Sequence, residues 1–433
     1  MNSSLLKEVV LEQRKVLESI DLGIKRQALG ELAKYIRLPH SIVISGIRRS
    51  GKSTLLAQII HNFYKDEGYY INFEDERLIE FSLADFNTLY EIFIELYGDK
   101  KTFFLDEIQN IPKWEIFVRR MQDRGYKFFI TGSNASLLSK KLGSKLTGRY
   151  ISLELYPFSF KEFLDFNDYS PGKDTFLITS ERGRIKRYFS EYLKKGGMPE
   201  YLKYKDNTLL KRAYEDILYR DIVARYEIKE VKALRELGFY FLSNIGGLFS
   251  YNSIKKLLRL GSVNTVKSYA DYLENSFLIF TIPRFSYSLK NQLASAKKAY
   301  CVDNGLIEAV AFQFSQNKGK FLENLVFIEL KRRYREIYYY KTNNGLEIDF
   351  LIRKGKRNAL LIQVTEGLGS DKVRRREVNA LTSAMDELKI KDALILTEDN
   401  EEKIKVKDNT ITVIPIYKWL LEKRLQKKLP VFK

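Results

Sequence analysis

The sequence Ser41-Ile-Val-Ile-Ser45, followed by Gly46-Ile-Arg-Arg-Ser-Gly51-Lys52-Ser53-Thr54, decides the fold of the first part of the chain. Its opening residues are small or β-branched and predict a short buried strand. The following pattern G-x-x-x-x-G-K-S runs into an apolar segment that predicts a helix. A strand, a glycine-containing loop and a helix in this order are typical of a phosphate-binding loop, in which backbone N–H groups and a helix N-terminus face an anion.

This loop predicts the binding of a nucleoside triphosphate. We expect Lys52 to reach the β- and γ-phosphates and the Ser53 hydroxyl to bind Mg²⁺. No motif that would contact the base distinguishes ATP from GTP. The predicted nucleotide-binding residues are Gly46, Ile47, Arg48, Arg49, Ser50, Gly51, Lys52, Ser53 and Thr54.

A second pattern, Thr102-Phe-Phe-Leu-Asp106-Glu107, combines a buried strand with two acids at its end. This pattern follows the phosphate-binding loop at the spacing that is typical of a Walker B motif. We predict that Asp106 holds the metal and that Glu107 polarises the attacking water.

The next predicted strand begins at Lys127 and ends in polar residues beside the same site. Asn134 is predicted to orient the water or sense the γ-phosphate, with Ser133 and Thr131 as alternatives. A helix over Ser136–Leu146 then leads to Arg149, which is either an arginine finger acting on a neighbouring subunit or a charge that complements the helix dipole. Strands that alternate with helices predict a parallel α/β core.

Composition limits the remaining choices. A chain of 433 residues is too long for one core, so several domains are expected. The formal net charge of +19 favours a polyanionic partner such as DNA, although a charged, thermophile-like surface would give the same balance. One cysteine and two histidines exclude a disulfide framework and a Cys- or His-rich metal site. Without a signal peptide or an apolar run long enough to cross a membrane, the chain is expected to be soluble and cytoplasmic.

The segments GIRRSGKST, YYINFEDERL, FFLDEIQNIPKWEIFVRR, FFITGSNASLLSKKL and LTGRYISLELYPFSFKEF resemble a family of archaeal and bacterial AAA+-type ATPases. In that family the ATPase module precedes a C-terminal domain of poorly understood role. The resemblance implies ATP and Mg²⁺ as cofactors, Gly46–Thr54 as Walker A, Asp106 and Glu107 as Walker B, and Asn134 as sensor 1. It assigns no second sensor.

Two groups of helices follow this core. Segments after Pro157, including Leu209–Tyr226, predict a helical lid. Three further helices and an extended hairpin through Pro283–Ser288 predict a winged helix, in which the third helix, Ser262–Asn275, contacts DNA. Basic residues outnumber acidic ones there, as phosphate neutralisation requires, although winged helices also serve as protein-interaction or packing modules. The predicted DNA-binding residues are Lys255, Lys256, Arg259, Asn264, Thr265, Lys267 and Arg284.

The last part of the chain predicts a helix, three strands, a helix and a strand. This order is similar to the PD-(D/E)xK nuclease core, whose active members hold Mg²⁺ with acids on the first helix and on the second and third strands. The matching positions are Glu323, Asp349 and Gln363. Thr365 stands where the catalytic lysine belongs, and Lys341 or Lys372 would have to replace it. This departure favours a nuclease-like fold retained for DNA binding or assembly over an active nuclease.

The predicted organisation is an AAA+ core with N-terminal helices (1–155), a helical lid (156–230), a winged helix (231–296) and an α/β nuclease-like domain (297–433). The predicted function is that of an oligomeric, Mg²⁺-dependent ATP hydrolase that binds and remodels DNA. One alternative is a STAND-like signalling switch, in which the nucleotide controls the binding of a protein partner. The other is an ATP-dependent nuclease.

Overall fold

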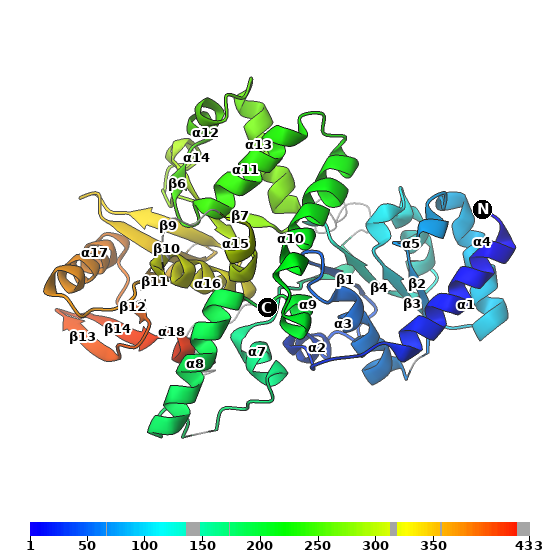
Figure 1. Cartoon of the computed structure of the whole chain (residues 1–433), viewed down its shortest axis with the longest axis horizontal. Helices are drawn as coiled ribbons and strands as arrows, with labels where there is room; N and C mark the ends of the chain where they lie inside the picture. Colours follow the sequence, from blue (N-terminus) through cyan, green and yellow to red (C-terminus); the bar gives the residue numbers. More distant parts are fainter. Residues whose placement is uncertain (66, 136–147, 173, 312–317, 356, 422–433) are drawn as a thin grey trace. The chain divides into compact units, whose positions relative to one another are not determined.

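The computed structural model describes residues 1–65, 67–135, 148–172, 174–311, 318–355 and 357–421 (Figure 1). The chain forms two compact units. Unit 1 comprises Met1–Pro157 with Asn275–Phe277, and unit 2 comprises Phe158–Glu274 and Leu278–Lys433. The helix predicted at residues 136–146 lies outside the described residues. Among the helices of the described ranges, none combines the length and apolar character that crossing a membrane requires.

A five-stranded sheet forms the centre of unit 1, with strand order β2-β3-β4-β1-β5. Every strand pair in it is parallel, as the alternation of strands and helices predicts. The strands are β1 (Ser41–Ser45), β2 (Tyr69–Asn72), β3 (Thr102–Asp106), β4 (Lys127–Gly132) and β5 (Tyr150–Glu154).

Helices cover both faces of this sheet, because alternate side chains of each strand point to opposite sides. Ile42 and Ile44 of β1 pack in a cluster with Leu55 of α3, whereas Val43 lies in a second cluster with Phe117 of α5. Burial on both faces explains why β1, β3 and β4 are largely apolar. The helices are α1 (Ser3–Ser19), α2 (Gln27–Leu32), α3 (Lys52–Ile59), α4 (Phe86–Tyr97) and α5 (Trp114–Gln122).

The second N-terminal helix is shorter than the sequence predicts. The apolar pattern suggests helix from Leu22 to Arg37, but regular helix spans only Gln27–Leu32. Gly23 adopts a left-handed φ of 55°, and the Asp21 carboxylate accepts a hydrogen bond from its backbone nitrogen at 2.9 Å. This local turn keeps the preceding segment out of the helix.

Unit 2 begins with helices that the sequence assigned to a lid. They include α7, capped by Ser159, whose hydroxyl accepts from the Glu162 backbone nitrogen while the Glu162 carboxylate accepts from the Ser159 nitrogen. A π-helical segment, Ile217–Ala224, continues the last of them. The helices are α7 (Phe160–Phe166), α8 (Thr179–Lys195), α9 (Pro199–Tyr204) and α10 (Asn207–Asp216).

Three helices and a small antiparallel sheet follow. The helices are α11 (Val231–Ser243), α12 (Tyr251–Leu257) and α13 (Val263–Asn275), and α13 begins one residue after the predicted start at Ser262 and ends at the predicted Asn275. The sheet has the order β6-β8-β7, with strands β6 (Leu248–Phe249), β7 (Ile279–Pro283) and β8 (Lys297–Cys301).

The hairpin in this sheet differs from the prediction. We expected its second arm within Pro283–Ser288 and assigned the strand near Tyr300 to the next domain. In the structure β7 pairs with β8, and the short helix α14 (Leu289–Ala294) lies between them. The apolar side chains of β8 explain the pairing, because Ala299, Tyr300 and Cys301 are buried on closing the sheet.

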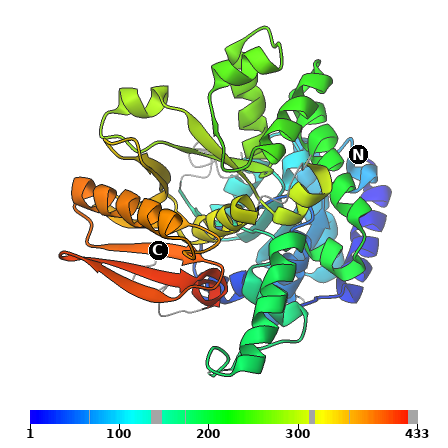
Figure 2. The ribbon, with the colours of Figure 1, turned by 60° about the vertical axis from the view of Figure 1, so that its left-hand side comes forward.

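A six-stranded mixed sheet, with order β13-β14-β12-β11-β10-β9, forms the rest of unit 2. Figure 2 shows α17 along one side of it, where Leu381 packs with Leu361. On the other side, Phe327 of α16 lies 6.2 Å from Phe350, measured between ring centroids. The elements are α15 (Asn304–Val310), α16 (Lys318–Arg333), β9 (Ile337–Lys341), β10 (Glu347–Lys354), β11 (Arg357–Val364), α17 (Asp371–Leu388), β12 (Asp392–Thr397), β13 (Glu402–Val406), β14 (Asn409–Pro415) and α18 (Ile416–Leu421).

Candidate functional site

The predicted nucleotide-binding groups of unit 1 gather at one edge of its sheet. Ser45 at the end of β1 is in register with Gly132 of β4, and Leu105, next to Asp106 in β3, is in register with Ile130. The carboxyl ends of these strands therefore meet at the edge where open α/β sheets bind ligands. The loop after β1 and the acids at the end of β3 lie there together.

The loop between β1 and α3 has the backbone shape that anion binding requires. A Cβ atom on Gly46 would lie 2.1 Å from the Leu155 carbonyl oxygen, so no larger residue fits. Gly51 precedes α3 with a left-handed φ of 89°. The buried Ser50 hydroxyl has no hydrogen-bond partner among the described residues. A tight glycine loop, a helix N-terminus and an unsatisfied hydroxyl fit a phosphate chain.

Lys52 is buried and contacts both the loop and the predicted catalytic acid. Its Nζ atom lies 3.1 Å from the Glu107 Oε1 atom and donates to the Ile47 carbonyl oxygen at 3.3 Å. With 4% of its side chain exposed, the ammonium is held at the loop by one carboxylate and one carbonyl. Phosphate oxygens could take over either contact, because a phosphate accepts the same charge-assisted hydrogen bonds.

Asp106 is fully buried and lies beside the other predicted metal ligand. The Ser53 hydroxyl hydrogen-bonds to its carboxylate, and the Thr131 hydroxyl donates to Oδ1. Burial raises the pKa of Asp106 to about 6, and the neighbouring Glu107 charge acts in the same direction. Ser53 and Asp106 thus supply the oxygen donors that Mg²⁺ prefers, and these residues fit the metal.

Glu107 has the surroundings of an ionised base. Burial raises its pKa, but the Lys52 ammonium and the Gln109 amide outweigh burial, so the pKa is lowered overall. Its backbone adopts a left-handed φ of 50°, and its N–H donates to the Thr131 hydroxyl at 3.0 Å. The carboxylate is therefore charged and fixed at the edge of the sheet.

The three alternatives for a sensor all lie at the end of β4. Thr131 touches both Walker B acids, whereas Ser133 accepts from the Gln109 amide at 3.4 Å. Asn134 is 1% exposed. The structure thus gives Thr131 a supporting role beside the acids, while the assignment of Asn134 as sensor stays a prediction.

Arg149 lies at the amino ends of the strands, opposite the carboxyl ends where the predicted nucleotide-binding groups gather. It precedes β5, whose first residue Tyr150 is in register with Ser41, the first residue of β1. Its guanidinium forms an ion pair with Asp123, and the side chain is 56% exposed. A residue at this end of the strands cannot contact a nucleotide in the loop after Ser45 of the same subunit. Its accessible position is compatible with a contact to another subunit.

Three residues support the site without any signal in the sequence. Arg26 is buried and donates to the carbonyl oxygens of Ser50 and Tyr156, both at 2.7 Å. Tyr70 donates to Asp106 at 3.4 Å, and Gln109 donates to Glu107. Arg26 lies outside the predicted motifs, whereas Tyr70 and Gln109 lie in segments that resemble the AAA+-type family but were given no role; each reaches the site only when the chain folds.

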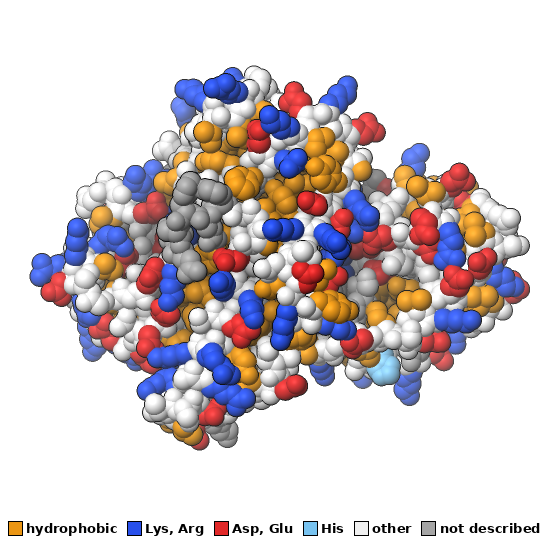
Figure 3. All heavy atoms as spheres, in the orientation of Figure 1, with side chains coloured by type: hydrophobic (Ala, Val, Ile, Leu, Met, Phe, Trp, Pro, Cys, Tyr) orange, Lys and Arg blue, Asp and Glu red, His pale blue; other side chains and the backbone are white. Residues whose placement is uncertain are grey.

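The predicted DNA-binding residues lie mainly on α12 and α13. Lys256, Arg259, Asn264 and Lys267 are exposed, and Lys255 and Thr265 are partly exposed. At the top of Figure 3, Lys and Arg side chains lie over α12. These positions form an accessible basic surface.

Arg284 does not belong to that surface. It follows β7 and donates to the Lys341 carbonyl oxygen of β9 at 3.1 Å, and its backbone pairs with Tyr339. This contact joins the two sheets of unit 2, which accounts for the position of Arg284 without a role in binding DNA.

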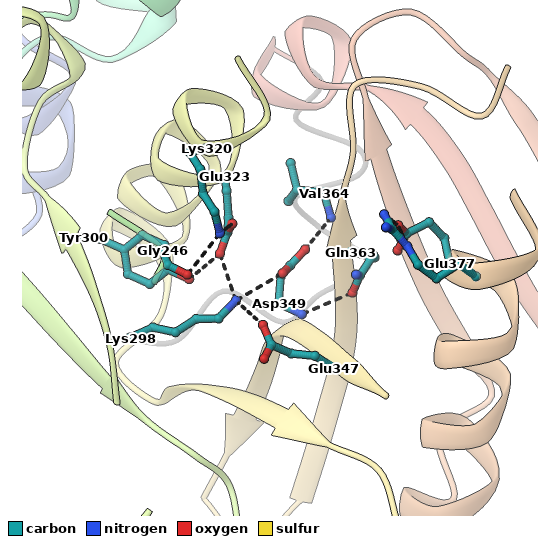
Figure 4. A network of polar contacts seen from close by, with 11 residues as sticks. Gly246, Lys298, Tyr300, Lys320, Glu323, Glu347, Asp349, Gln363, Val364 and Glu377 are labelled. Atoms are coloured by element: carbon teal, nitrogen blue, oxygen red, sulfur yellow. Dashed lines mark hydrogen bonds and ion pairs between the residues drawn. The ribbon is translucent and has the colours of Figure 1, made fainter. Parts of the chain in front are cut away.

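The predicted nuclease-like residues come together in a buried cluster (Figure 4). Glu323 on α16 and Asp349 on β10 approach the same point, and Gln363 on β11 accepts from the Asp349 backbone nitrogen at 3.1 Å. A register shift between Ile348 and Leu351 interrupts the pairing of β10 with β9 and directs Asp349 inward. Burial raises the pKa of Asp349 to about 7, and the Glu323 charge adds to this shift.

A lysine that the sequence does not predict enters this cluster. Lys298 of β8 contacts Glu323, Glu347 and Asp349, whereas Lys341 and Lys372 are exposed. Burial lowers the pKa of Lys298, but the surrounding groups, Tyr300 and Asp349 first among them, outweigh burial and raise it overall.

Three family models match the chain in succession. A model described as "AAA domain" covers residues 39–164, which include the loop and both Walker B acids. Domains of unknown function follow, DUF8612 over residues 186–317 and DUF4143 over residues 318–419. The sheet and site of unit 1 are therefore those of an AAA-type P-loop domain.

Two relatives match most of the chain in sequence. "Uncharacterized protein MJ1544" of Methanocaldococcus jannaschii is 36% identical over 97% of this chain and 97% of its own length. An "Uncharacterized protein" of Haemophilus influenzae is 31% identical over 88% of this chain and 94% of its own. The chain belongs to the family of AAA-domain proteins that contains these two relatives.

The ORC1 protein of Aeropyrum pernix, solved in complex with DNA, is 14% identical over 69% of this chain and 95% of that one, with a TM-score of 0.30.

Proposed function

We propose that the chain is an Mg²⁺-dependent ATP hydrolase that acts on DNA as a homo-oligomer. The observation that carries the proposal is the convergence of Lys52, Ser53, Asp106 and Glu107 at one edge of the parallel sheet of an AAA domain. These groups bind phosphate, bind a metal and accept a proton, which together are what hydrolysis of a nucleoside triphosphate needs.

The residues divide this work between them. The loop N–H groups and the Lys52 ammonium would hold the phosphate chain. Ser53 and Asp106 would hold Mg²⁺, which supplies charge neutralisation when bound. Glu107, once its ion pair with Lys52 is exchanged for a phosphate contact, would orient a water and accept its proton.

Arg149 is proposed to complete the site of a neighbouring subunit. Because Arg149 lies at the amino ends of the strands, its guanidinium is too far from the loop after β1 to contact a nucleotide of its own subunit, and it remains accessible to a neighbouring one. Arg149→Ala should lower turnover on the order of 10³-fold, as loss of an arginine finger does. Mixing Arg149→Ala with Lys52→Ala subunits should restore activity, since some interfaces would then hold one intact loop and one intact arginine. Failure of this rescue at concentrations where oligomers form would contradict the shared site.

DNA is proposed to bind at α12 and α13. The helices α11–α13 and the sheet β6-β8-β7 follow the element order of a winged helix, in which the third helix contacts DNA. Lys256, Arg259 and Lys267 supply accessible positive charge on this surface. The sheet of β9–β12 with α16 and α17 has the order of a nuclease-like core, and we propose that it acts in binding or assembly.

The direct test is the ATP turnover rate of the wild-type chain with and without duplex DNA, at several salt concentrations. The proposal predicts turnover that DNA stimulates, with stimulation that weakens steeply as salt rises. Turnover that DNA leaves unchanged at modest salt would contradict the DNA part and favour a switch that binds a protein. Absence of turnover under all conditions would contradict the hydrolase part.

A further inference from the structure

The strongest unexplained feature of unit 2 is the buried ammonium of Lys298. Its Nζ atom lies 3.0 Å from Glu323 Oε1, 2.8 Å from Glu347 Oε1 and 3.2 Å from Asp349 Oδ1 (Figure 4). The Lys298 side chain is 1% exposed. Three carboxylates from α16 and β10 thus surround one charge that arrives from β8, a strand of the other sheet.

The two buried acids of the cluster, Glu323 and Asp349, form further hydrogen bonds within the protein. The Tyr300 hydroxyl donates to Glu323 Oε1 at 2.8 Å, and Lys320 donates to Glu323 Oε2 at 3.0 Å. The Val364 backbone N–H donates to Asp349 Oδ2 at 2.9 Å. Both oxygens of each of these two acids therefore have partners, as buried charges require.

A divalent cation and this ammonium would compete for the same place. Magnesium needs several oxygen ligands at about 2.0–2.1 Å in near-octahedral geometry. The oxygens of Glu323, Glu347 and Asp349 that could supply them already converge on the Lys298 Nζ atom.

We propose that the Lys298 ammonium is the resident cation of this centre and occupies the position that a divalent metal would take. The centre is then a cluster of ion pairs that needs no metal. It holds β8, and with it the three-helix segment α11–α13, against α16 and β10. This role does not depend on ATP hydrolysis. It assigns the C-terminal domain a structural use of the nuclease-like acids and excludes metal-dependent cleavage at this centre.

The proposal implies a latent metal site. Lys298→Ala removes the ammonium and leaves a space lined by three carboxylates, which is a donor set for Mn²⁺ or Mg²⁺. Lys298→Ala in the full-length chain should therefore gain one Mn²⁺ site in the absence of nucleotide, measured from the electron paramagnetic resonance signal of free Mn²⁺. The added site should disappear in Lys298→Ala/Asp349→Asn. Lys297→Ala, a change of the adjacent lysine on β8, is the matched control and should gain no site.

If Lys298→Ala does not fold, Mn²⁺ binding by the wild-type chain still tests whether this centre holds a metal. Mn²⁺ titrations of wild type and Asp349→Asn should coincide, because Asp349 binds the ammonium and no metal. Should Glu347→Gln be the better-folded variant, the same coincidence is expected. A wild-type Mn²⁺ site that either substitution removes would overturn the proposal, as would a folded Lys298→Ala that gains no site. These titrations contain no nucleotide, so failure of the ATPase proposal would not affect them.

Discussion

Both units contain a buried lysine beside carboxylates, but the two lysines are held in different ways. Lys52 of unit 1 contacts one carboxylate and one backbone carbonyl at the carboxyl ends of the strands, next to a loop whose Ser50 hydroxyl has no hydrogen-bond partner in the part of the chain that the structure describes. Lys298 of unit 2 contacts three carboxylates, of which Glu323 and Asp349 are buried and Glu347 is partly exposed. The first set of contacts can be exchanged for a ligand, whereas the second is complete without one.

This difference separates residues that bind from residues that hold the fold together. By sequence position alone, acids that could hold a metal occur in both units, although Thr365 in place of the catalytic lysine already argues against an active nuclease in unit 2. The structure distinguishes them by the number of partners that each lysine has and by which element supplies it. We propose that Lys52, the first residue of α3, binds a phosphate, and that Lys298, which comes from a neighbouring sheet, stabilises the packing of unit 2.

The largest expected effect concerns the stability of unit 2. Lys298→Met keeps most of the side-chain volume but leaves three carboxylates without their cation, which should lower the free energy of unfolding by about 3–5 kcal/mol. Urea denaturation followed by circular dichroism measures this loss. Lys297→Met should change the free energy of unfolding by less than about 1 kcal/mol, because Lys297 is only partly buried. Equal effects of the two substitutions would remove the contrast between the lysines.

The converse holds for Lys52. Lys52→Ala should lower ATP turnover by at least about 100-fold, since a phosphate contact in a buried site is lost, and should weaken the binding of a fluorescent ATP analogue. Without nucleotide, Lys52→Ala should lower the free energy of unfolding in urea much less than Lys298→Met does. The reason is that Lys52 forms an ion pair with only one carboxylate, that of Glu107. A Lys52→Ala chain that unfolds as readily as Lys298→Met would show that Lys52 is also structural.

A smaller effect is expected at the basic surface. Replacing Lys256, Arg259 and Lys267 by Ala should reduce the slope of log affinity for duplex DNA against log salt by about 3, roughly one for each phosphate contact. Replacing Lys403, Lys405 and Lys407 by Ala removes the same charge from the strand β13 and the turn after it. If that control lowers the slope equally, net charge rather than α12 and α13 determines binding.

The smallest effect concerns pH. Burial raises the pKa of Asp349 to about 7 from an ordinary value of 3.8. A raised folded-state pKa gives stability that is complete below pH 3.8 and is lost as pH rises through about 7. The charged groups facing Asp349 are Lys298, Glu323 and Glu347, with Lys320 behind Glu323. Wild type should therefore lose stability between pH 5 and pH 7.5 more steeply than Asp349→Asn, by up to about 1.4 kcal/mol per pH unit. Parallel curves would contradict the raised pKa.

The sequence predicts unit 1 well because its signals are local. The loop beginning at Gly46 follows β1 directly, Asp106 ends β3 and Glu107 follows it, and parallel strands bring their carboxyl ends to one side of the sheet. Arg26 could not be predicted, since it reaches Ser50 and Tyr156 only when the N-terminal segment folds onto the loop.

In unit 2 the sequence predicts the acids of the cluster but not the lysine that they bind. The positions of Glu323, Asp349 and Gln363 follow from the order of helices and strands, and the structure brings them together. Lys298 lies 25 residues from Glu323 and 51 from Asp349 in the sequence. Its strand pairs with β6 and β7, so no pattern near the acids indicates its presence.

The measurement that tests the central claim most directly is the ATP turnover rate of Glu107→Gln beside wild type, with Mg²⁺ and saturating ATP. The amide cannot accept a proton, so turnover should fall at least about 100-fold while ATP remains bound through Lys52. Glu67→Gln, an exposed carboxyl change in the same unit, should leave turnover unaltered. Hydrolysis by Glu107→Gln at the wild-type rate would contradict the assignment of this edge of the sheet as the hydrolytic site.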